Sequence, residues 1–225
     1  MLMNRETSSL LVVDVQERLL PSIADGEAVL GNCDWLVGVA RRMGVPVVVS
    51  EQYPEGLGPT AASLRATAAD APVVTKTHFS CVADGCLAGT AVEQRRQVVV
   101  VGTEAHVCVQ QTVLDLLAAG RQVFVVDEAV GSRRPRDKEL ALQREAEILA
   151  GDAGIGLINL GLLNLDLLGG GFLDLLPAAR ERLATGRPIG PAERRRSQAL
   201  DPVVDVGRGV GHAAALERAA VADAG

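Results

Sequence analysis

The chain has 225 residues, of which 48% are hydrophobic and 2% aromatic, and its formal net charge is −6. This length allows one sizeable α/β domain whose core is built from aliphatic side chains. The negative charge argues against nucleic acid and acidic membrane surfaces as partners, and no apolar run approaches the ~20 residues of a membrane span.

Apolar runs rich in β-branched residues recur along the chain without polar alternation, which is typical of strands buried on both faces of a parallel sheet. These runs cover residues 10–15, 45–50, 72–75, 97–101 and 122–126, and a sixth run covers 155–160. Amphipathic stretches between them predict helices over 28–43, 61–69, 88–96, 107–119 and 137–150. Repeated strand–helix–strand units predict right-handed crossovers and a doubly wound α/β sheet.

The C-terminal part has weaker patterns. Residues 162–168 and 173–183 are compatible with helices on either side of three consecutive glycines. After about residue 185 the composition shifts to Arg, Ala, Gly, Pro and Asp with little periodicity. We therefore predict a domain over 1–184 and a disordered or loosely docked tail over 185–225, with a helix near 213–222 left open.

Reactive or charged residues stand at the ends of several predicted strands. Asp14 ends the first strand, Lys76 the third, and Cys108 follows the fourth near the start of a helix. In doubly wound sheets, ligands bind beyond the carboxyl ends of the strands. If the strands are adjacent, these three residues meet at one edge of the sheet.

Such a trio suits acyl transfer without a metal. A helix N-terminus and a nearby ammonium favour the thiolate that makes Cys108 nucleophilic. The Asp14 carboxylate can accept the thiol proton and return it to a leaving group. Backbone N–H groups between Gly102 and Cys108 can hold an oxyanion. The plainer alternatives are a structural Asp14–Lys76 ion pair and a packed Cys108, and Asp127 at the end of the fifth strand reads as a turn cap.

Metal chemistry has little support in the sequence. The four cysteines, Cys33, Cys81, Cys86 and Cys108, match no zinc spacing. His78 and His212 have no carboxylate or histidine at ligand spacing, and His106 lies only two residues before Cys108, where helical residues do not face each other. We therefore expect no metal and no cofactor.

Three strings resemble the isochorismatase-like cysteine hydrolases: LLVVDVQERLLPSI, VVTKTHFS, and VVVVGTEAHVCVQQTVLDLLAAGRQVFVVDEAVGSR. The insert SEQYPEGLGPT is most similar to the isochorismatase-domain-containing hydrolases of unassigned substrate. The likeness is strong over residues 8–136 and weak to about residue 184. It implies a three-layer α/β/α sandwich with a six-stranded parallel sheet.

By motif, the resemblance makes Asp14 the general base, Lys76 the catalytic lysine and Cys108 the nucleophile. It also implies a cis peptide at Thr103–Glu104 and an oxyanion hole formed by the N–H groups of Glu104 and Cys108. Gln16, Tyr53 and Phe79 lie just beyond strand ends and are candidate pocket residues. Relatives of this kind commonly form homo-oligomers, which we expect here too.

Absent motifs narrow the reaction that the resemblance implies. Nicotinamidases of this superfamily bind a metal through an Asp-x-His pair after the second strand, where this chain has Glu51, Gln52 and Tyr53. True isochorismatases lack the cysteine nucleophile. The remaining expectation is a hydrolase that cleaves an amide or carbamoyl C–N bond of a small molecule. One departure is Asn159–Gly161, which stands where relatives carry Thr-Thr-Glu.

Two other functions stay open. The altered 159–161 stretch and the long tail are compatible with a catalytically silent scaffold or interaction protein. The short gap between Cys81 and Cys86 is compatible with a thiol-based redox sensor. Residues 1–9 lack the order of a signal peptide, so we expect a cytoplasmic location.

Overall fold

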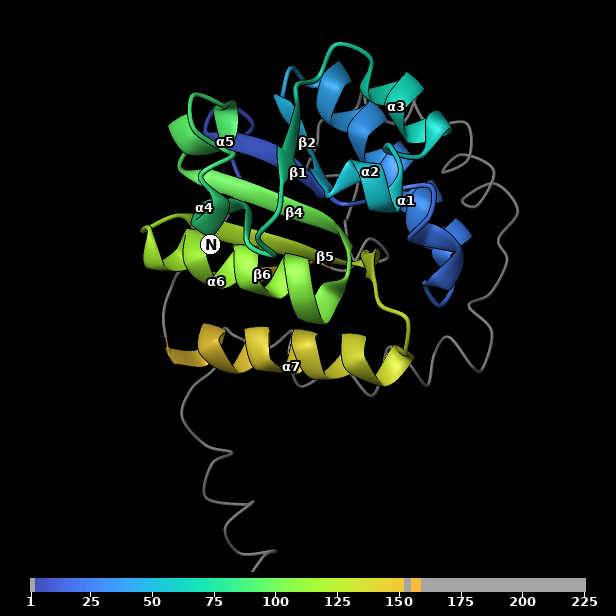
Figure 1. The fold of residues 1–225 in the computed structure, drawn as a ribbon. Coiled ribbons are helices and arrows are strands. Elements are labelled where there is room, and N and C mark those ends of the chain that lie inside the picture. Colours follow the sequence, from blue (N-terminus) through green and yellow to red (C-terminus); the bar gives the residue numbers. More distant parts are fainter. Residues whose placement is uncertain (1–2, 152–154, 159–225) are drawn as a thin grey trace, which may run out of the picture. The chain divides into compact units, whose positions relative to one another are not determined.

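A computed structural model describes residues 3–151 and 155–158, all of them within the unit Met1–Asn164 (Figure 1). Its centre is a parallel sheet with the strand order β3-β2-β1-β4-β5-β6. The strands are β1 (Ser8–Val13), β2 (Val47–Gln52), β3 (Val73–Lys76), β4 (Gln97–Thr103), β5 (Gln122–Gly131) and β6 (Ile155–Ile158). The predicted α/β architecture with a parallel sheet is confirmed.

Alternate residues of β1, β2, β4 and β5 supply two separate cores, one on each face of the sheet. In β1, Leu11 and Val13 belong to one core and Leu10 and Val12 to the other, and all six residues of the strand are buried. A strand covered on both faces carries mostly apolar side chains on both of them. This explains why the strand runs show no polar alternation.

Helices cover both faces (Figure 1). α1 (Gly26–Arg42) packs against α3 (Ala62–Ala68) and against the sheet on one face. On the other face, α6 (Gln110–Ala118) and α7 (Pro135–Gly151) pack against β5 and against the π-helix η2 (Ala105–Val109). Shorter elements are η1 (Leu20–Ser22), α2 (Pro54–Leu57), α4 (Cys81–Asp84) and α5 (Ala91–Gln94).

Two predicted helices differ from the structure. The helix predicted over 88–96 is only the four-residue α5 (Ala91–Gln94). Gly89 adopts a left-handed φ of 76°, which is not helical, so the helix can begin only after this residue. The helix predicted over 107–119 starts earlier, at Ala105, and its first turn is the π-helix η2. This wider turn carries Cys108 at the end of β4.

β5 does not end at Asp127 as predicted but continues to Gly131. Its pairing with β4 shifts between Val100 and Gly102, so that several β5 residues bulge opposite one residue of β4. Asp127 lies in this bulge and forms a 2.9 Å ion pair with Lys138 instead of capping a turn.

The strand order reverses between β1 and β4, whose register pairs Val13 with Gly102. Gly102 has a φ of 118°, and a side chain there would overlap the Val13 backbone. The two chains can approach this closely only because residue 102 has no Cβ. At this switch point, sheets of this type form a crevice beyond their strand ends.

The predictions for 162–168, 173–183, the tail 185–225 and the stretch Asn159–Gly161 lie outside the described residues. Among the described helices, none combines the length and apolarity needed to cross a membrane.

Candidate active site

Asp14 and Lys76 form a buried ion pair at the carboxyl edge of the sheet. The Lys76 Nζ atom lies 2.7 Å from Asp14 Oδ2, and neither side chain is exposed to solvent. Lys76 Nζ also donates to Gln52 Oε1 at 2.7 Å and to the His78 carbonyl at 3.3 Å. Burial alone lowers the pKa of Lys76, but its acidic neighbours, with Asp14 first among them, outweigh this effect and the pKa is raised. The lysine is therefore cationic.

The prediction assumed that the strands leading to Asp14 and Lys76 are adjacent. The structure shows that these strands, β1 and β3, are not neighbours in the sheet. β2 lies between β1 and β3, and the register places Gln52 of β2 beside Lys76. The long lysine side chain reaches past β2 to Asp14, and the Gln52 amide supports its ammonium on the way.

The backbone and neighbours of Asp14 fix its carboxylate. Asp14 has a left-handed φ of 50°, which turns the chain sharply at the end of β1. Its N–H donates to the Ser50 carbonyl at 3.1 Å, and its own carbonyl accepts from Thr103 Oγ1 at 2.8 Å. The Ser50 hydroxyl donates to Asp14 Oδ1 at 2.7 Å. With Lys76 on Oδ2, both carboxylate oxygens are held in place.

Cys108 completes the group. It is 6% exposed, and its thiol interacts with both Asp14 and Lys76. Burial, followed by the charge of Asp14, raises the pKa of the Cys108 thiol, while Lys76 opposes the rise without cancelling it. The structure therefore brings the three predicted residues together, but the resting thiol is neutral and not the thiolate expected from the sequence.

The segment before Cys108 has an unusual backbone. The Thr103–Glu104 peptide bond is cis, and Glu104 is the residue that precedes η2. The Glu104 carboxylate pairs with Arg133 at 2.8 Å and accepts from the Arg133 backbone N–H at 3.2 Å. These contacts tie the start of η2 to the loop after β5.

A cavity of about 360 Å³ opens at this site. Its lining includes Asp14 and Cys108, together with Leu19, Gln52, Leu57, Phe79, Glu104, His106, Val107, Arg133, Arg134 and Asp137. Of the three candidate pocket residues, the structure places only Phe79 on its wall. Phe79 is 51% exposed, which is typical of a residue at the rim.

Gln16 and Tyr53 do not line this cavity. Gln16 is fully buried, and its amide bonds both backbone groups of Gln52, at 2.8 and 3.0 Å, and the Gly58 carbonyl, at 2.6 Å. Its partners are main-chain groups of the loop after β2, so it positions that loop. Tyr53 precedes α2 with a left-handed φ of 39°, is 56% exposed, and covers Gly56.

The sequence did not predict the charged residues that line the cavity wall. Arg133, Arg134 and Asp137 come from the loop after β5 and the start of α7. His106 also lines the cavity, and its Nδ1 lies 3.0 Å from Ser132 Oγ. The only available signal was the dense run of charges in GSRRPRD, which gives no spacing that predicts a site.

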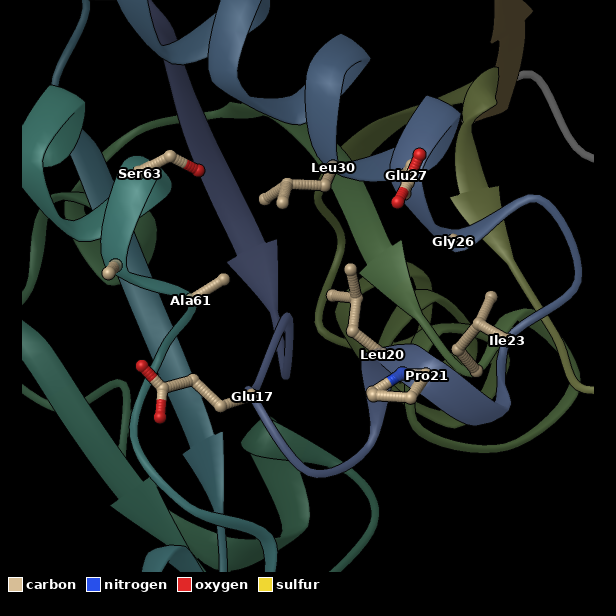
Figure 2. A pocket seen from close by; sticks show the side chains of 10 residues that line it. Glu17, Leu20, Pro21, Ile23, Gly26, Glu27, Leu30, Ala61 and Ser63 are labelled. Carbon is tan, nitrogen blue, oxygen red and sulfur yellow. The ribbon is translucent and has the colours of Figure 1, made fainter.

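A second cavity of about 460 Å³ lies between η1, α1 and α3 (Figure 2). Leu20, Ile23 and Leu30 give it an aliphatic wall, with the carboxylates of Glu17 and Glu27 beside them. It contains no thiol, lysine or histidine among its lining residues. The Asp14 carboxylate and the Cys108 thiol thus line the smaller of the two cavities.

Within residues 3–151 and 155–158, no three His, Cys, Asp or Glu side chains are grouped closely enough to hold a metal ion. His78 is exposed and pairs with Asp84 at 3.0 Å. The N–H groups of Thr77 and His78, together with the His78 side chain, lower the pKa of Asp84 to about 2. This pair therefore stabilises the loop after β3.

Comparison with known proteins adds three findings. The family model for the isochorismatase domain matches residues 8–151. Isochorismatase domain-containing protein 1 of Danio rerio is 43% identical over 141 residues, which are 62% of this chain and 50% of that protein. Protein 2A of the same name in Mus musculus is 40% identical over 139 residues, 62% of this chain and 66% of its own length. The aligned part thus spans about half to two thirds of these relatives.

Solved structures give the same picture. The MAR1 ribonuclease of Caenorhabditis elegans superposes with a TM-score of 0.66 and 35% identity over 75% of this chain and 85% of that chain. The YcaC gene product of Escherichia coli, described as an octameric hydrolase of unknown specificity, gives a TM-score of 0.68 at 22% identity over 90% of this chain and 97% of its own. The latter likeness bears on the fold alone.

Proposed function

Since the chain belongs to the isochorismatase family, we propose that it is a metal-independent cysteine hydrolase that cleaves an amide or carbamoyl C–N bond of a small molecule. One observation carries the proposal: a buried carboxylate, Asp14, contacts both an ammonium and a thiol on the wall of a cavity. The three residues would act as a nucleophile, a general base and a fixed positive charge.

In the first step, Asp14 accepts the Cys108 proton as the sulfur attacks the substrate carbonyl carbon. The thiol is neutral at rest because burial and the charge of Asp14 raise its pKa. Proton removal is therefore coupled to attack, and Lys76 stabilises the negative charge while it lies on sulfur. The backbone N–H groups of Glu104 and Cys108 would hold the carbonyl oxygen as it becomes an oxyanion.

In the second step, the tetrahedral intermediate collapses and the C–N bond breaks. Asp14 returns the proton to the leaving nitrogen, so ammonia or an amine departs and a Cys108 thioester remains. Water then attacks the thioester, with Asp14 accepting one proton from it. The products are a carboxylic or carbamic acid and the free Cys108 thiol, which regains its proton from Asp14.

The cavity supports a small substrate. Its volume of about 360 Å³ lies near the lower end of small-molecule pockets. Its wall combines Leu19, Leu57 and Phe79 with charged side chains of both signs. We further propose that the protein works as a homo-oligomer and in the cytoplasm, where a reducing environment keeps thiols free; all four cysteines are unpaired here.

RNA cleavage is the competing activity, because the similar Caenorhabditis elegans protein is described as a ribonuclease. Two observations favour the small-molecule reaction in this chain. Its formal net charge is −6, whereas RNA binding draws on basic surfaces. The nucleophilic group lies in a cavity and is only 6% exposed. The alternative that is not an enzyme is a catalytically silent scaffold or interaction protein.

The test is a screen of small amides, ureas and carbamates, with release of ammonia or amine as the readout and a quenched RNA substrate in parallel. Wild-type protein should turn over at least one amide-type compound, and Cys108→Ala should lose that turnover. Cys33→Ala, which removes a buried free thiol that does not line the cavity, serves as the matched control. Cleavage of RNA alone, or full turnover by Cys108→Ala, would overturn the proposal.

A further inference from the structure

Two cysteines outside the proposed mechanism lie in one turn of the chain. Cys81 begins the one-turn helix α4, and Gly85 ends it with a left-handed φ of 79°. The chain therefore folds back, and Cys86 Sγ lies 3.4 Å from the Cys81 carbonyl oxygen. The Cys86 thiol donates to this carbonyl, so its sulfur is held against the backbone of Cys81.

This pair is connected to the candidate active site. The Asp14 charge raises the pKa of the Cys81 thiol, while the Lys76 charge and the Ser50 hydroxyl lower it, so these three groups lie near its sulfur. The same Ser50 hydroxyl donates to Asp14 Oδ1 at 2.7 Å. A continuous series of contacts thus runs from Cys86 through Cys81 and Ser50 to the proposed general base.

The two sulfurs differ in charge and exposure. The hydrogen bond from Cys86 is the largest cause that lowers the pKa of Cys81, and the same bond raises the pKa of Cys86. Cys81 is fully buried, whereas Cys86 is half-buried. One sulfur of the pair is therefore poised to lose its proton, and the other is accessible from solvent. Low thiol pKa beside a second cysteine is the arrangement that redox-active dithiols use.

We propose that Cys81 and Cys86 form an oxidation site that reacts with a hydroperoxide and closes into an intrachain disulfide. A thiolate of the pair attacks the O–O bond, which breaks, and an S–O bond forms. The released alkoxide or hydroxide takes up a proton to give an alcohol or water. The second sulfur then attacks the sulfenic acid, an S–S bond forms and water leaves. Two thiols are oxidised and one hydroperoxide is reduced.

The disulfide changes the surroundings of Asp14. It removes the Cys81 thiol group from its contact with Ser50, so the hydrogen bond from Ser50 to Asp14 loses its outer partner. Neighbouring hydrogen bonds polarise one another, and the loss is transmitted to the carboxylate. This second part rests on the proposed function of Asp14 and Cys108, whereas disulfide formation does not.

The test uses the full chain treated with low concentrations of hydrogen peroxide, alkylated and digested with trypsin. Cys81 and Cys86 fall together in the peptide 77–95, whereas Cys33 and Cys108 fall in two other peptides. The wild type should yield peptide 77–95 without alkylation and two hydrogen atoms lighter, and dithiothreitol should reverse this. Cys86→Ser, and Cys86→Ala as a second variant, should not form the product, while the control Cys33→Ser should.

The effect on the site is read in the same samples from the rate of Cys108 alkylation. Oxidation should change this rate about threefold or more in the wild type, the effect of one neutral hydrogen bond, and should leave it unchanged in Cys86→Ser. Free Cys81 and Cys86 after peroxide would overturn the oxidation site without touching the hydrolase proposal. A disulfide with an unchanged Cys108 rate would overturn only the link between them.

Discussion

The Lys76 ammonium lies 2.7 Å from the Asp14 carboxylate, and both side chains are completely excluded from solvent. Such a pair is costly to bury, because both charges lose their hydration. Ser50 and Gln52 offset part of this cost through hydrogen bonds to the carboxylate and to the ammonium. The pair contacts Cys108, so the fold maintains this arrangement at the place where the proposed reaction needs it.

Lys76→Met should destabilise the protein by about 3–5 kcal/mol, since removing one partner leaves the Asp14 charge buried alone. Urea unfolding followed by circular dichroism measures the change. The double variant Asp14→Asn/Lys76→Met should regain part of the loss, because it leaves no unpaired charge. The control is Asp70→Asn, which breaks the ion pair between Arg41 and Asp70. The Asp70 side chain is 90% exposed, so this variant should lose less than about 1 kcal/mol of stability. Equal effects of Lys76→Met and Asp70→Asn would show that the buried pair is unimportant for stability.

Gly102→Ala should destabilise the fold by about 3 kcal/mol or more. Residue 102 has a φ of 118°, and a Cβ would overlap the backbone of Val13 in β1; both effects oppose the native conformation. The matched control is Gly120→Ala, where φ is 76° but nothing lies within 4 Å of the added Cβ. That variant should lose about 1–2 kcal/mol. If thermal unfolding gave the two variants the same loss of stability, the overlap with the Val13 backbone would add nothing to the cost of the left-handed φ.

Glu145→Gln should make the protein more stable at alkaline pH. Glu145 is 1% exposed on α7, and no described group hydrogen-bonds to either carboxylate oxygen. Burial raises the pKa of Glu145 from 4.5 to about 8. Between these values the folded state binds the proton and the unfolded state has lost it, so stability falls as pH rises. At about 1.4 kcal/mol per unit, the rise from 4.5 to about 8 corresponds to a loss on the order of 5 kcal/mol above pH 8.

The measurement is the free energy of unfolding of both proteins at pH 5 and at pH 8.5. The wild type should lose stability relative to Glu145→Gln between these values, because the amide does not ionise. Glu139→Gln provides the control, since Glu139 is 65% exposed on the same helix. Parallel pH profiles for wild type and Glu145→Gln would mean that Glu145 has an ordinary pKa in the folded protein.

The sheet could be predicted because strands covered on both faces leave a continuous apolar signal, as in β1 and β4. The same criterion cut β5 short, because Asp127 and Glu128 interrupt its apolar run although the strand continues to Gly131. The bulge opposite β4 accommodates these polar residues, and Asp127 gains a partner on α7. No local pattern carries that information.

For the site, Asp14, Lys76 and Cys108 could be selected because each interrupts or follows an apolar strand at its carboxyl end. Gln16 was misassigned because its partners, Gln52 and Gly58, are 36 and 42 residues away. The contribution of Arg133 also depends on tertiary structure, since it pairs with Glu104 across 29 residues of chain. The neutral state of Cys108 follows from burial, which spacing alone does not reveal.

The most direct test of the central claim is the pH dependence of Cys108 alkylation by iodoacetamide in wild type, Asp14→Asn and Lys76→Met. Asp14 raises the pKa of the thiol and Lys76 lowers it. The apparent pKa of Cys108 should therefore shift down in Asp14→Asn and up in Lys76→Met, by about one unit or more for charges in contact. Opposite shifts would establish that the three residues act as one site. The same apparent pKa in all three proteins would contradict the proposed catalytic group.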